Sequence, residues 1–379
     1  MPALESSAAP QPLILSRLAH DVHAAAVRWA LRRTGLRPVW AQTLADPAMT
    51  PVSLYADDVR GLRFAGGLGC GAASSVWFRR PQLPQDFPGA AAADLSFLRD
   101  EWKRHVANVH AVAASADGVF WVNRPDLAAA AENKLLQLRA AHRCGLRFPA
   151  TLVSSDPDEI RRFFAAHPAV IHKPYATHSW RDAEGRIFST YARLLAAEDL
   201  RDDATLRLCP AIYQACVRKR RDLRVTVIGQ RMFAAAVEAD DAGDGVVDWR
   251  AAAIGGGERW RAVALPADAE ASLRRLMETL GLVFGCIDLV VDEDDQLHFL
   301  EINQAGQFLF VEHALPELPL LRATAAMLAQ ARADYALEAM PADIAYAGFL
   351  QDPEEMAWWA SVAGGIRGAD GTIPGVSEE

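Results

Sequence analysis

Short apolar runs alternate with amphipathic stretches in the first third of the chain. The pattern predicts a strand at residues 13–15, a helix at 21–34 that ends at Gly35, a strand at Val39 and Trp40, and strands at 76–78 and 119–122. A strand, helix, strand order of this kind is typical of parallel sheets. Residues 1–125 are therefore expected to form an open α/β lobe.

Two further lobes are predicted downstream. Residues 126–208 show helix, strand, helix and strand patterns, at residues 127–144, 150–153, 158–166 and 170–173. Residues 209–335 combine strand patterns with one clear helix at 267–280, which indicates mainly antiparallel sheet. The acidic segment 336–379 has no periodicity that predicts an element. The expected fold class is α/β with α+β character, in three lobes.

Composition and charge exclude several classes of protein. The chain is 51% hydrophobic and 23% charged, and its net charge of -9 argues against broad, sequence-independent binding of nucleic acid. The five cysteines include no CxxC pair, so they are expected to be reduced thiols. Neither a secretion signal nor an apolar run of about 20 residues is visible, so we expect a cytoplasmic protein without membrane contact.

The strongest chemical signal is a predicted hairpin with acidic positions in apolar strands. If Asp294 and Asp295 form a two-residue turn, Asp288 lies opposite Glu301, and Asn303 follows two residues later on the same face. Hard oxygen donors of this kind suit Mg²⁺. The alternative is an exposed hairpin whose polar residues face water, but a charge in an apolar strand needs a partner.

Cations that suit phosphate occur at several positions. Lys134 lies on a helix face and Lys173 ends an apolar strand, where each serves either as a point charge for phosphate or as a solvated surface lysine. Arg224 and Arg250 are candidates for phosphate or carboxylate contact, because the arginine fork matches both groups. The run 218–221 is interpreted as a basic turn or a peptide contact.

An apolar strand at residues 212–217 precedes that basic run. The backbone around Cys216 and Val217 is a candidate to pair with an adenine edge, and Asp222 is a candidate to accept hydrogen bonds from ribose hydroxyls. The alternative is a plain antiparallel hairpin with a basic turn.

Taken in order, these residues resemble the ATP-grasp superfamily and, more narrowly, the microviridin-type peptide maturases, or graspetide synthetases. The matching stretches are 76–81, 133–138, 222–229, 248–250, 284–288 and 299–308. The resemblance implies that ATP lies between two lobes and that Mg²⁺ is held by Asp288, Glu301 and Asn303. It further implies ATP contacts from Lys134, Ile171, Lys173, Gln214, Ala215, Cys216, Val217, Asp222 and Leu300, and catalytic roles for Arg224, Arg250 and Lys173.

The resemblance also implies a reaction and a partner. Such enzymes phosphorylate an Asp or Glu side chain of a precursor peptide, and a Ser or Thr hydroxyl or a Lys amine then displaces phosphate to close a macrocyclic ester or amide. A precursor peptide and a homodimer are therefore expected. Two departures stand out: residues 174–179 lack the glycines typical of a phosphate-covering loop, and the chain continues beyond about residue 330, where the family core ends.

Other interpretations remain open at this point. The same fold also serves ligases that join an amino acid to a protein terminus or to a small metabolite, and a nucleotide-binding regulator without catalysis is a third reading. A metal site at His20, Asp21 and His23 is an alternative to a helix cap at Asp21. The stretch 77–80 either meets peptide or seals a lobe interface, and the pair 358–359 docks on the body or on a partner.

Overall fold

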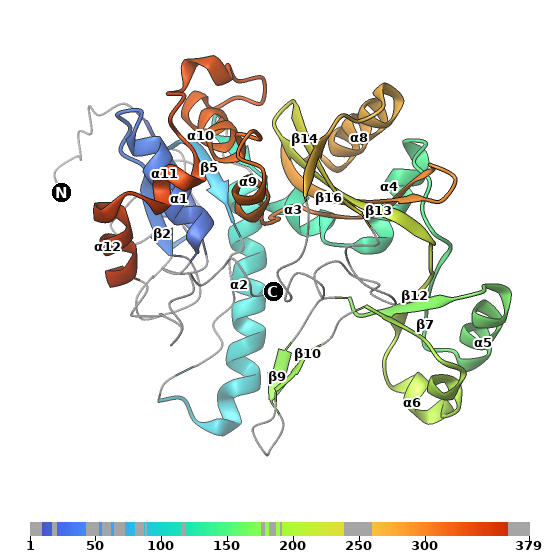
Figure 1. Ribbon diagram of the computed structural model, residues 1–379. Helices are drawn as coiled ribbons and strands as arrows, with labels where there is room; N and C mark the ends of the chain where they lie inside the picture. Colours follow the sequence, from blue (N-terminus) through green and yellow to red (C-terminus); the bar gives the residue numbers. More distant parts are fainter. Residues whose placement is uncertain are drawn as a thin grey trace.

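The computed structural model describes residues 10–16, 21–42, 53–54, 62–63, 73–79, 87, 89–114, 118–175, 179–181, 187–189, 192–238 and 260–362. Two four-stranded sheets and one five-stranded sheet organise these ranges, together with two small two-stranded sheets, and helices lie beside the larger ones (Figure 1). The predicted mixture of helix and sheet is confirmed. None of the helices in these ranges has the length and apolar character needed to cross a membrane.

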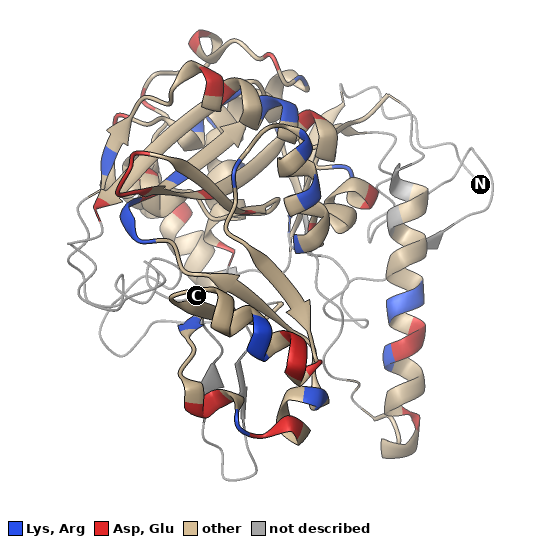
Figure 2. Cartoon of the chain, turned by 90° about the vertical axis from the view of Figure 1, so that its right-hand side faces the viewer, with Lys and Arg blue, Asp and Glu red and all other residues tan. Residues whose placement is uncertain are grey.

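The N-terminal sheet is parallel, as the strand, helix, strand pattern predicted. Its strands lie in the order β2-β1-β5-β6. The elements of this part are β1 (Gln11–Ser16), α1 (Val22–Arg32), β2 (Val39–Gln42), the small pair β3 (Ser53–Leu54) and β4 (Leu62–Arg63), β5 (Ala73–Phe78), a 3-10 turn (Ala92–Asp94), α2 (Leu95–Ala114) and β6 (Phe120–Val122). Figure 2 shows α2 standing at one side of the molecule, with basic and acidic positions coloured along it.

The central lobe contains a four-stranded antiparallel sheet in the order β11-β8-β12-β7 and a separate two-stranded hairpin. Its elements are β7 (Thr151–Ser154), α5 (Pro157–Ala166), β8 (Val170–Lys173), β9 (Ser179–Arg181), β10 (Ile187–Ser189), β11 (Arg193–Leu194), a 3-10 turn (Ala197–Leu200), α6 (Asp203–Leu208) and β12 (Ala211–Ala215). The predicted single helix over 127–144 is two helices, α3 (Pro125–Ala131) and α4 (Lys134–Arg143). The chain breaks there because the Asn133 side chain accepts the Leu136 amide and starts α4 as a new helix.

The five-stranded antiparallel sheet in the order β15-β14-β13-β16-β17 is the framework of the candidate site. Its elements are β13 (Lys219–Ile228), β14 (Arg231–Glu238), β15 (Arg261–Val263), α8 (Ala267–Leu280), β16 (Phe284–Asp292) and β17 (Leu297–Asn303). One face packs against α4 and α8 through alternate residues such as Leu223, Ile287 and Leu289. The opposite face is covered at one end, where Ile228 and Phe284 join a core cluster shared with the N-terminal lobe.

Two helices that the sequence did not predict follow the five-stranded sheet, α9 (Leu309–Ala314) and α10 (Leu320–Gln330). The described part of the segment 336–379, for which no element was predicted either, contains a 3-10 turn (Leu337–Ala339), α11 (Tyr346–Leu350) and α12 (Pro353–Val362). Helices α11 and α12 lie beside α1 (Figure 1), where Glu355 binds two arginines of α1 and Asp352 accepts from the indole of Trp29 at 2.9 Å. Trp359 is buried in the core cluster, so the pair 358–359 docks on the body of the chain.

Candidate active site

The two acids predicted to bind metal face each other across the β16–β17 hairpin. The strands pair antiparallel, with Asp288 opposite Glu301 and Cys286 opposite Asn303, so the predicted pairing is confirmed. Opposed residues of an antiparallel pair lie on the same face of the sheet, which brings the carboxylates of Asp288 and Glu301 to one surface. That surface is the one opposite to α4 and α8.

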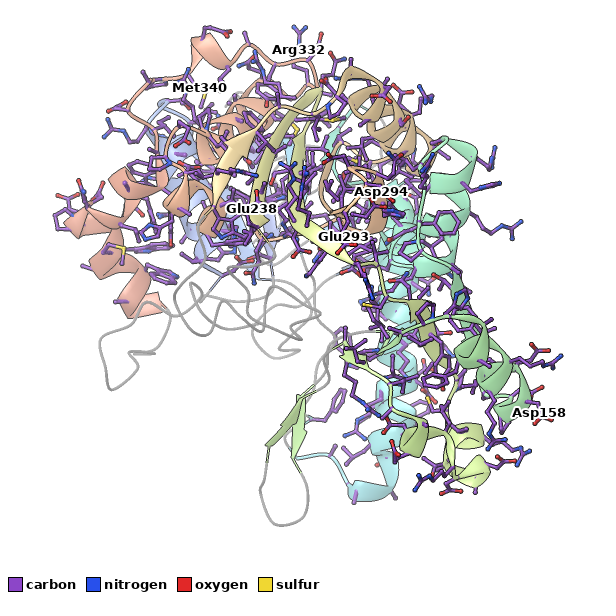
Figure 3. The ribbon with its side chains drawn as sticks, turned by 45° about the vertical axis from the view of Figure 1, so that its right-hand side comes forward. Asp158, Glu238, Glu293, Asp294, Arg332 and Met340 are labelled. Carbon is purple, nitrogen blue, oxygen red and sulfur yellow. The ribbon has the colours of Figure 1, made fainter. Side chains whose placement is uncertain are left out.

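The turn of this hairpin differs from the predicted one. The loop holds three residues, 293–295, closed by the Asp292 amide donating to the Gln296 carbonyl at 3.0 Å. Asp295 has a φ of 61°, the left-handed conformation that ends many three-residue hairpin loops. Figure 3 labels Glu293 and Asp294 at this turn. The two-residue turn is therefore wrong, and strand pairs next to the loop are shifted by one residue relative to the prediction.

A β-bulge restores the register before the acids are reached. It lies between the pairs Leu289–Phe299 and Asp288–Glu301, at Leu300. The cause is packing: Phe299 and Ile302 are three residues apart, yet both are buried in the same core cluster. A regular strand alternates its faces and cannot bury both, whereas one extra residue between them allows it. Glu301 is thereby placed opposite Asp288.

Each of these carboxylates has a cation at hydrogen-bond distance. Arg224 on β13 lies opposite Asp288, and its Nη1 donates to Asp288 Oδ1 at 2.8 Å, with both side chains buried. Lys134, the first residue of α4, donates from Nζ to Glu301 Oε2 at 2.6 Å, and about a quarter of each side chain is exposed. The side chains of β13, β16, β17 and α4 therefore form one row across the sheet, with the two acids in the middle and one cation at each end.

The position of Lys134 is fixed by the next turn of its helix. Gln137, which is buried, donates from Nε2 to the Ile302 carbonyl at 2.9 Å and accepts the Ile302 amide at 3.0 Å. Further along β17, the Phe299 amide donates to the Arg147 carbonyl at 2.8 Å. Helix α4 is thus locked to β17 in register, which holds Lys134 beside Glu301.

The donor set at the hairpin suits Mg²⁺. Asp288 and Glu301 offer carboxylate oxygens, and Asn303 offers an amide oxygen that also accepts the Ala305 amide at 3.0 Å. Within the described ranges, no three His, Cys, Asp or Glu side chains are grouped to hold a metal ion. Two acids and an amide are an incomplete shell, which matches a hard ion that takes its remaining ligands from water and phosphate oxygens.

The central sheet carries a second set of polar side chains that are linked by hydrogen bonds. Lys173 Nζ donates to Gln214 Oε1 at 2.7 Å, and Gln214 Nε2 donates to Thr151 Oγ1 at 3.0 Å. Ile171 is the strand partner of Gln214. Gln214 is buried, so its side chain holds the ammonium group of Lys173 in a fixed position at the end of β8.

The segment that joins β12 to β13 contains the predicted adenine contact. The amides of Ala215 and Cys216 donate to the carbonyls of Ala150 and Ala169, both at 2.9 Å. These two amides are therefore paired within the central lobe. Burial raises the pKa of the Cys216 thiol, and the nearby ammonium groups of Lys219 and Lys173 act in the opposite direction.

Comparison with known proteins gives one consistent answer. No protein-family model and no curated protein matches the chain. Among solved structures, macrocyclase MdnC from Microcystis aeruginosa MRC, bound with precursor peptide MdnA, superposes with a TM-score of 0.73 at 27% identity, covering 84% of this chain and 99% of that one. Macrocyclase MdnB from the same organism gives a TM-score of 0.68 at 27% identity, with 84% and 99% covered. A Chryseobacterium gregarium RiPP-associated ATP-grasp ligase, in complex with ADP and a leader and core peptide, gives 0.72 at 22% identity, with 85% and 97% covered.

The chain has the ATP-grasp fold and is similar to ATP-grasp ligases over most of its length. The match to the ATP-grasp ligase at 22% identity supports the fold, and the two macrocyclases at 27% identity agree with it over nearly their whole length. The resemblance drawn from the motifs is thereby confirmed.

The other predicted residues of the ligase are placed as follows. Asp222 is buried and its Oδ2 accepts from Lys219 Nζ at 2.7 Å. Leu300 is half-buried at the bulge beside Glu301. Arg250 and its motif 248–250 lie outside the described residues.

Several residues that the sequence offered as candidates for binding make contacts within the fold instead. Arg220 and Arg221 form ion pairs with Asp295 in the turn of the β16–β17 hairpin. Residues 219–221 of the run 218–221 begin strand β13, and β12 and β13 belong to different sheets, so the predicted basic turn of a plain hairpin is wrong. Asp21 caps α1 by accepting the amides of His23 and Ala24. His23 is buried and bonds to backbone amides, and His20 lies outside the described residues.

Sequence reasoning missed the groups that hold the connection after β17. Arg79 is buried and donates from Nη1 to the Ala305 carbonyl at 3.1 Å, so the stretch 77–80 seals a lobe interface at this residue. Asn123 donates from Nδ2 to the carbonyls of Gln304 and Phe284. The available signal was a charged or amide residue directly after an apolar strand, where a buried polar group requires a partner.

Proposed function

We propose that this ligase is an ATP-dependent macrocyclase of a ribosomally made precursor peptide. The observation that carries the proposal is the row formed by Arg224, Asp288, Glu301 and Lys134, in a chain that matches macrocyclase MdnC over 84% of its length. MdnC was solved with its precursor peptide, and a ligase of the same fold was solved with ADP and a leader and core peptide.

The proposed roles follow from position and charge. Asp288, Glu301 and Asn303 would hold Mg²⁺, which when bound neutralises charge on the phosphates. Lys134 and Arg224 lie within 3 Å of these carboxylates and present positive charge to the same surface. Lys173, fixed by Gln214 on the central sheet, would meet the phosphates from the other lobe.

The nucleotide base and ribose would lie between the two sheets. We assign the adenine to the segment from Ala215 to Val217, with Ile171, Gln214 and Leu300 around it. Asp222, two residues before Arg224 on β13, would accept from the ribose hydroxyls. Arg250 is assigned with Arg224 to the reacting phosphoryl group by its motif alone.

The reaction balances with ATP and peptide as the only reactants. A carboxylate oxygen of a peptide Asp or Glu takes the γ-phosphoryl group, and ADP leaves. A hydroxyl or amine of the same peptide then attacks the acyl carbon, phosphate departs with the bonding electrons, and the attacking group loses its proton. Each ring costs one ATP, and the peptide loses the elements of one water. Positioning and charge supply the catalysis, so no protein nucleophile is required.

The test is reconstitution with the precursor encoded beside the gene. The purified ligase, ATP, Mg²⁺ and that peptide should give a product lighter by one water for each ring, with one ADP formed for each. A peptide whose Asp and Glu residues are replaced by Asn and Gln is the matched control and should keep its mass. ATP consumption with an unchanged peptide would favour a ligase acting on another amine, and no consumption would favour a nucleotide-binding regulator.

Two properties expected from the sequence stay predictions: the homodimer and the cytoplasmic location. Light scattering of the purified ligase at several concentrations measures the mass of the assembly directly.

A further inference from the structure

The loop after β17, residues 303–309, is held by side chains from distant parts of the chain. Every carbonyl oxygen from residue 303 to residue 307 accepts a hydrogen bond, in order from the Gly306 amide, Asn123 Nδ2, Arg79 Nη1, Arg79 Nη1 again at 3.5 Å, and Arg224 Nη2. Such complete pairing fixes the path of a loop that has no regular structure of its own. The backbone carbonyls of residues 303–307 are therefore all paired, although this loop belongs to no sheet.

Arg79 makes the central contact from the N-terminal lobe. It follows β5 directly, and its Nε donates to Asp21 Oδ2 at 2.9 Å while Nη1 reaches the Ala305 carbonyl at 3.1 Å. Only 2% of Arg79 is exposed, so this charge depends on Asp21 for compensation. Because β1 and β5 are parallel, Asp21 and Arg79 both follow the same edge of the sheet.

His23 holds the far end of the same loop. Its Nε2 accepts the amides of Phe308 at 3.0 Å and Leu309 at 3.3 Å, and its ring packs edge-on against Phe308. An imidazole nitrogen that accepts carries no proton, so His23 is the neutral tautomer protonated at Nδ1. The cap of α1 thus supplies both Asp21 and His23 to this contact.

These contacts reach the predicted metal ligands in two steps. Arg79 holds the Ala305 carbonyl, and the Ala305 amide donates to the Asn303 side-chain oxygen. On the other side, Arg224 joins the Gln307 carbonyl to Asp288. The orientation of Asn303 therefore depends on a residue of another lobe.

We propose that Arg79, held by Asp21, is a positioning residue for the Mg²⁺ and nucleotide site, and this rests on the proposed function. It touches neither metal nor nucleotide. It keeps the 303–309 loop in the one path that turns Asn303 toward the face of Glu301 and Asp288. Loss of such an outer contact typically lowers metal affinity by about 10- to 100-fold.

The experiment measures ADP binding by calorimetry with excess EDTA and across a Mg²⁺ titration, without peptide. Arg79→Lys keeps the charge but lacks the planar fork that spans Asp21 and Ala305. We expect it to raise the Mg²⁺ concentration for half-maximal enhancement of ADP binding by about 10-fold or more, with metal-free ADP affinity unchanged. Arg28→Lys is the matched control, because Arg28 lies in the same lobe and forms an ion pair with Glu355 away from the loop. It should leave the Mg²⁺ response unchanged.

A second variant keeps the test decisive if Arg79→Lys does not fold. Asp21→Asn retains a good helix cap but removes the charge that holds Arg79, and it should shift the Mg²⁺ response in the same direction. A Mg²⁺ response equal to that of Arg28→Lys, or an equal loss of metal-free ADP binding, overturns the positioning role. Wild-type protein that binds no ADP overturns the proposed function itself.

Discussion

Replacement of Glu301 by Gln should lower the rate of catalysis much more than the stability of the fold. The amide has nearly the shape of the carboxylate but lacks its charge, so Lys134 loses its ion-pair partner and the proposed metal site loses an anionic ligand. The Lys134–Glu301 pair is 27% and 22% exposed, and pairs this accessible contribute about 1 kcal/mol or less to stability. Loss of one preorganised electrostatic group costs about 10² to 10³ in turnover, or about 3 to 4 kcal/mol. The effect on catalysis should therefore exceed the effect on folding.

The assay follows ADP release with saturating peptide over a Mg²⁺ titration, alongside thermal melting. Glu293→Gln is the matched control, because Glu293 lies exposed in the turn of the same hairpin (Figure 3). We expect Glu301→Gln to melt near the wild type, to turn over at least about 100-fold more slowly, and to need more Mg²⁺. If its turnover and Mg²⁺ dependence match those of Glu293→Gln, the paired carboxylates do not form the metal site.

Three further changes test the packing around the site. Arg224→Met leaves Asp288 buried beside an apolar side chain, so urea denaturation should show a loss of about 3 to 5 kcal/mol in the free energy of unfolding. A second change, Asp288→Leu, should partly restore this free energy, and a loss that does not recover would contradict a buried ion pair. Burial raises the pKa of Glu312 from 4.5 to about 7, so the folded state binds this proton more tightly than the unfolded state does. The contribution of Glu312 to the free energy of unfolding is fully present below pH 4.5, and about 3 kcal/mol of it is lost as the pH rises through 7. Glu312→Gln should lack this pH dependence, and the same dependence of the melting temperature on pH in wild type and variant would contradict the reasoning. Glu355→Gln removes the carboxylate that binds two arginines of α1 and should lower the melting temperature, whereas the exposed neighbour change Glu354→Gln should not.

The hairpin illustrates what a sequence can and cannot predict. The sequence predicted that Asp288 lies opposite Glu301 by counting from an assumed two-residue turn, and the pairing itself is correct. The route to that pairing was wrong, because the loop has one more residue than predicted and the bulge at Leu300 compensates for it. The bulge follows from burial of Phe299 and Ile302 in one cluster, which is a property of the packed core and not of the local pattern.

Local signals were sufficient where the partner lies nearby and failed where it lies far along the chain. The capping residue Asn133 is a local signal for the break before Lys134, but the apolar pattern continues through it and led to the prediction of a single helix. The contact of Arg79 with Ala305 joins residues 226 positions apart, and no local pattern reports it. Helix α12 is only ten residues long, and its contact with α1 joins residues more than 300 positions apart, which no local pattern reports.

The way α4 meets β17 also limits how a peptide can approach. A strand at the end of a sheet ordinarily offers unsatisfied backbone groups to which another chain can add, either a ligand or an aggregating copy. Here the Ile302 backbone is bonded to a glutamine side chain and the Phe299 amide to the Arg147 carbonyl, so this border is closed. No further strand can therefore pair with β17 at Phe299 or Ile302, which protects this border of the sheet from association with another copy of the chain.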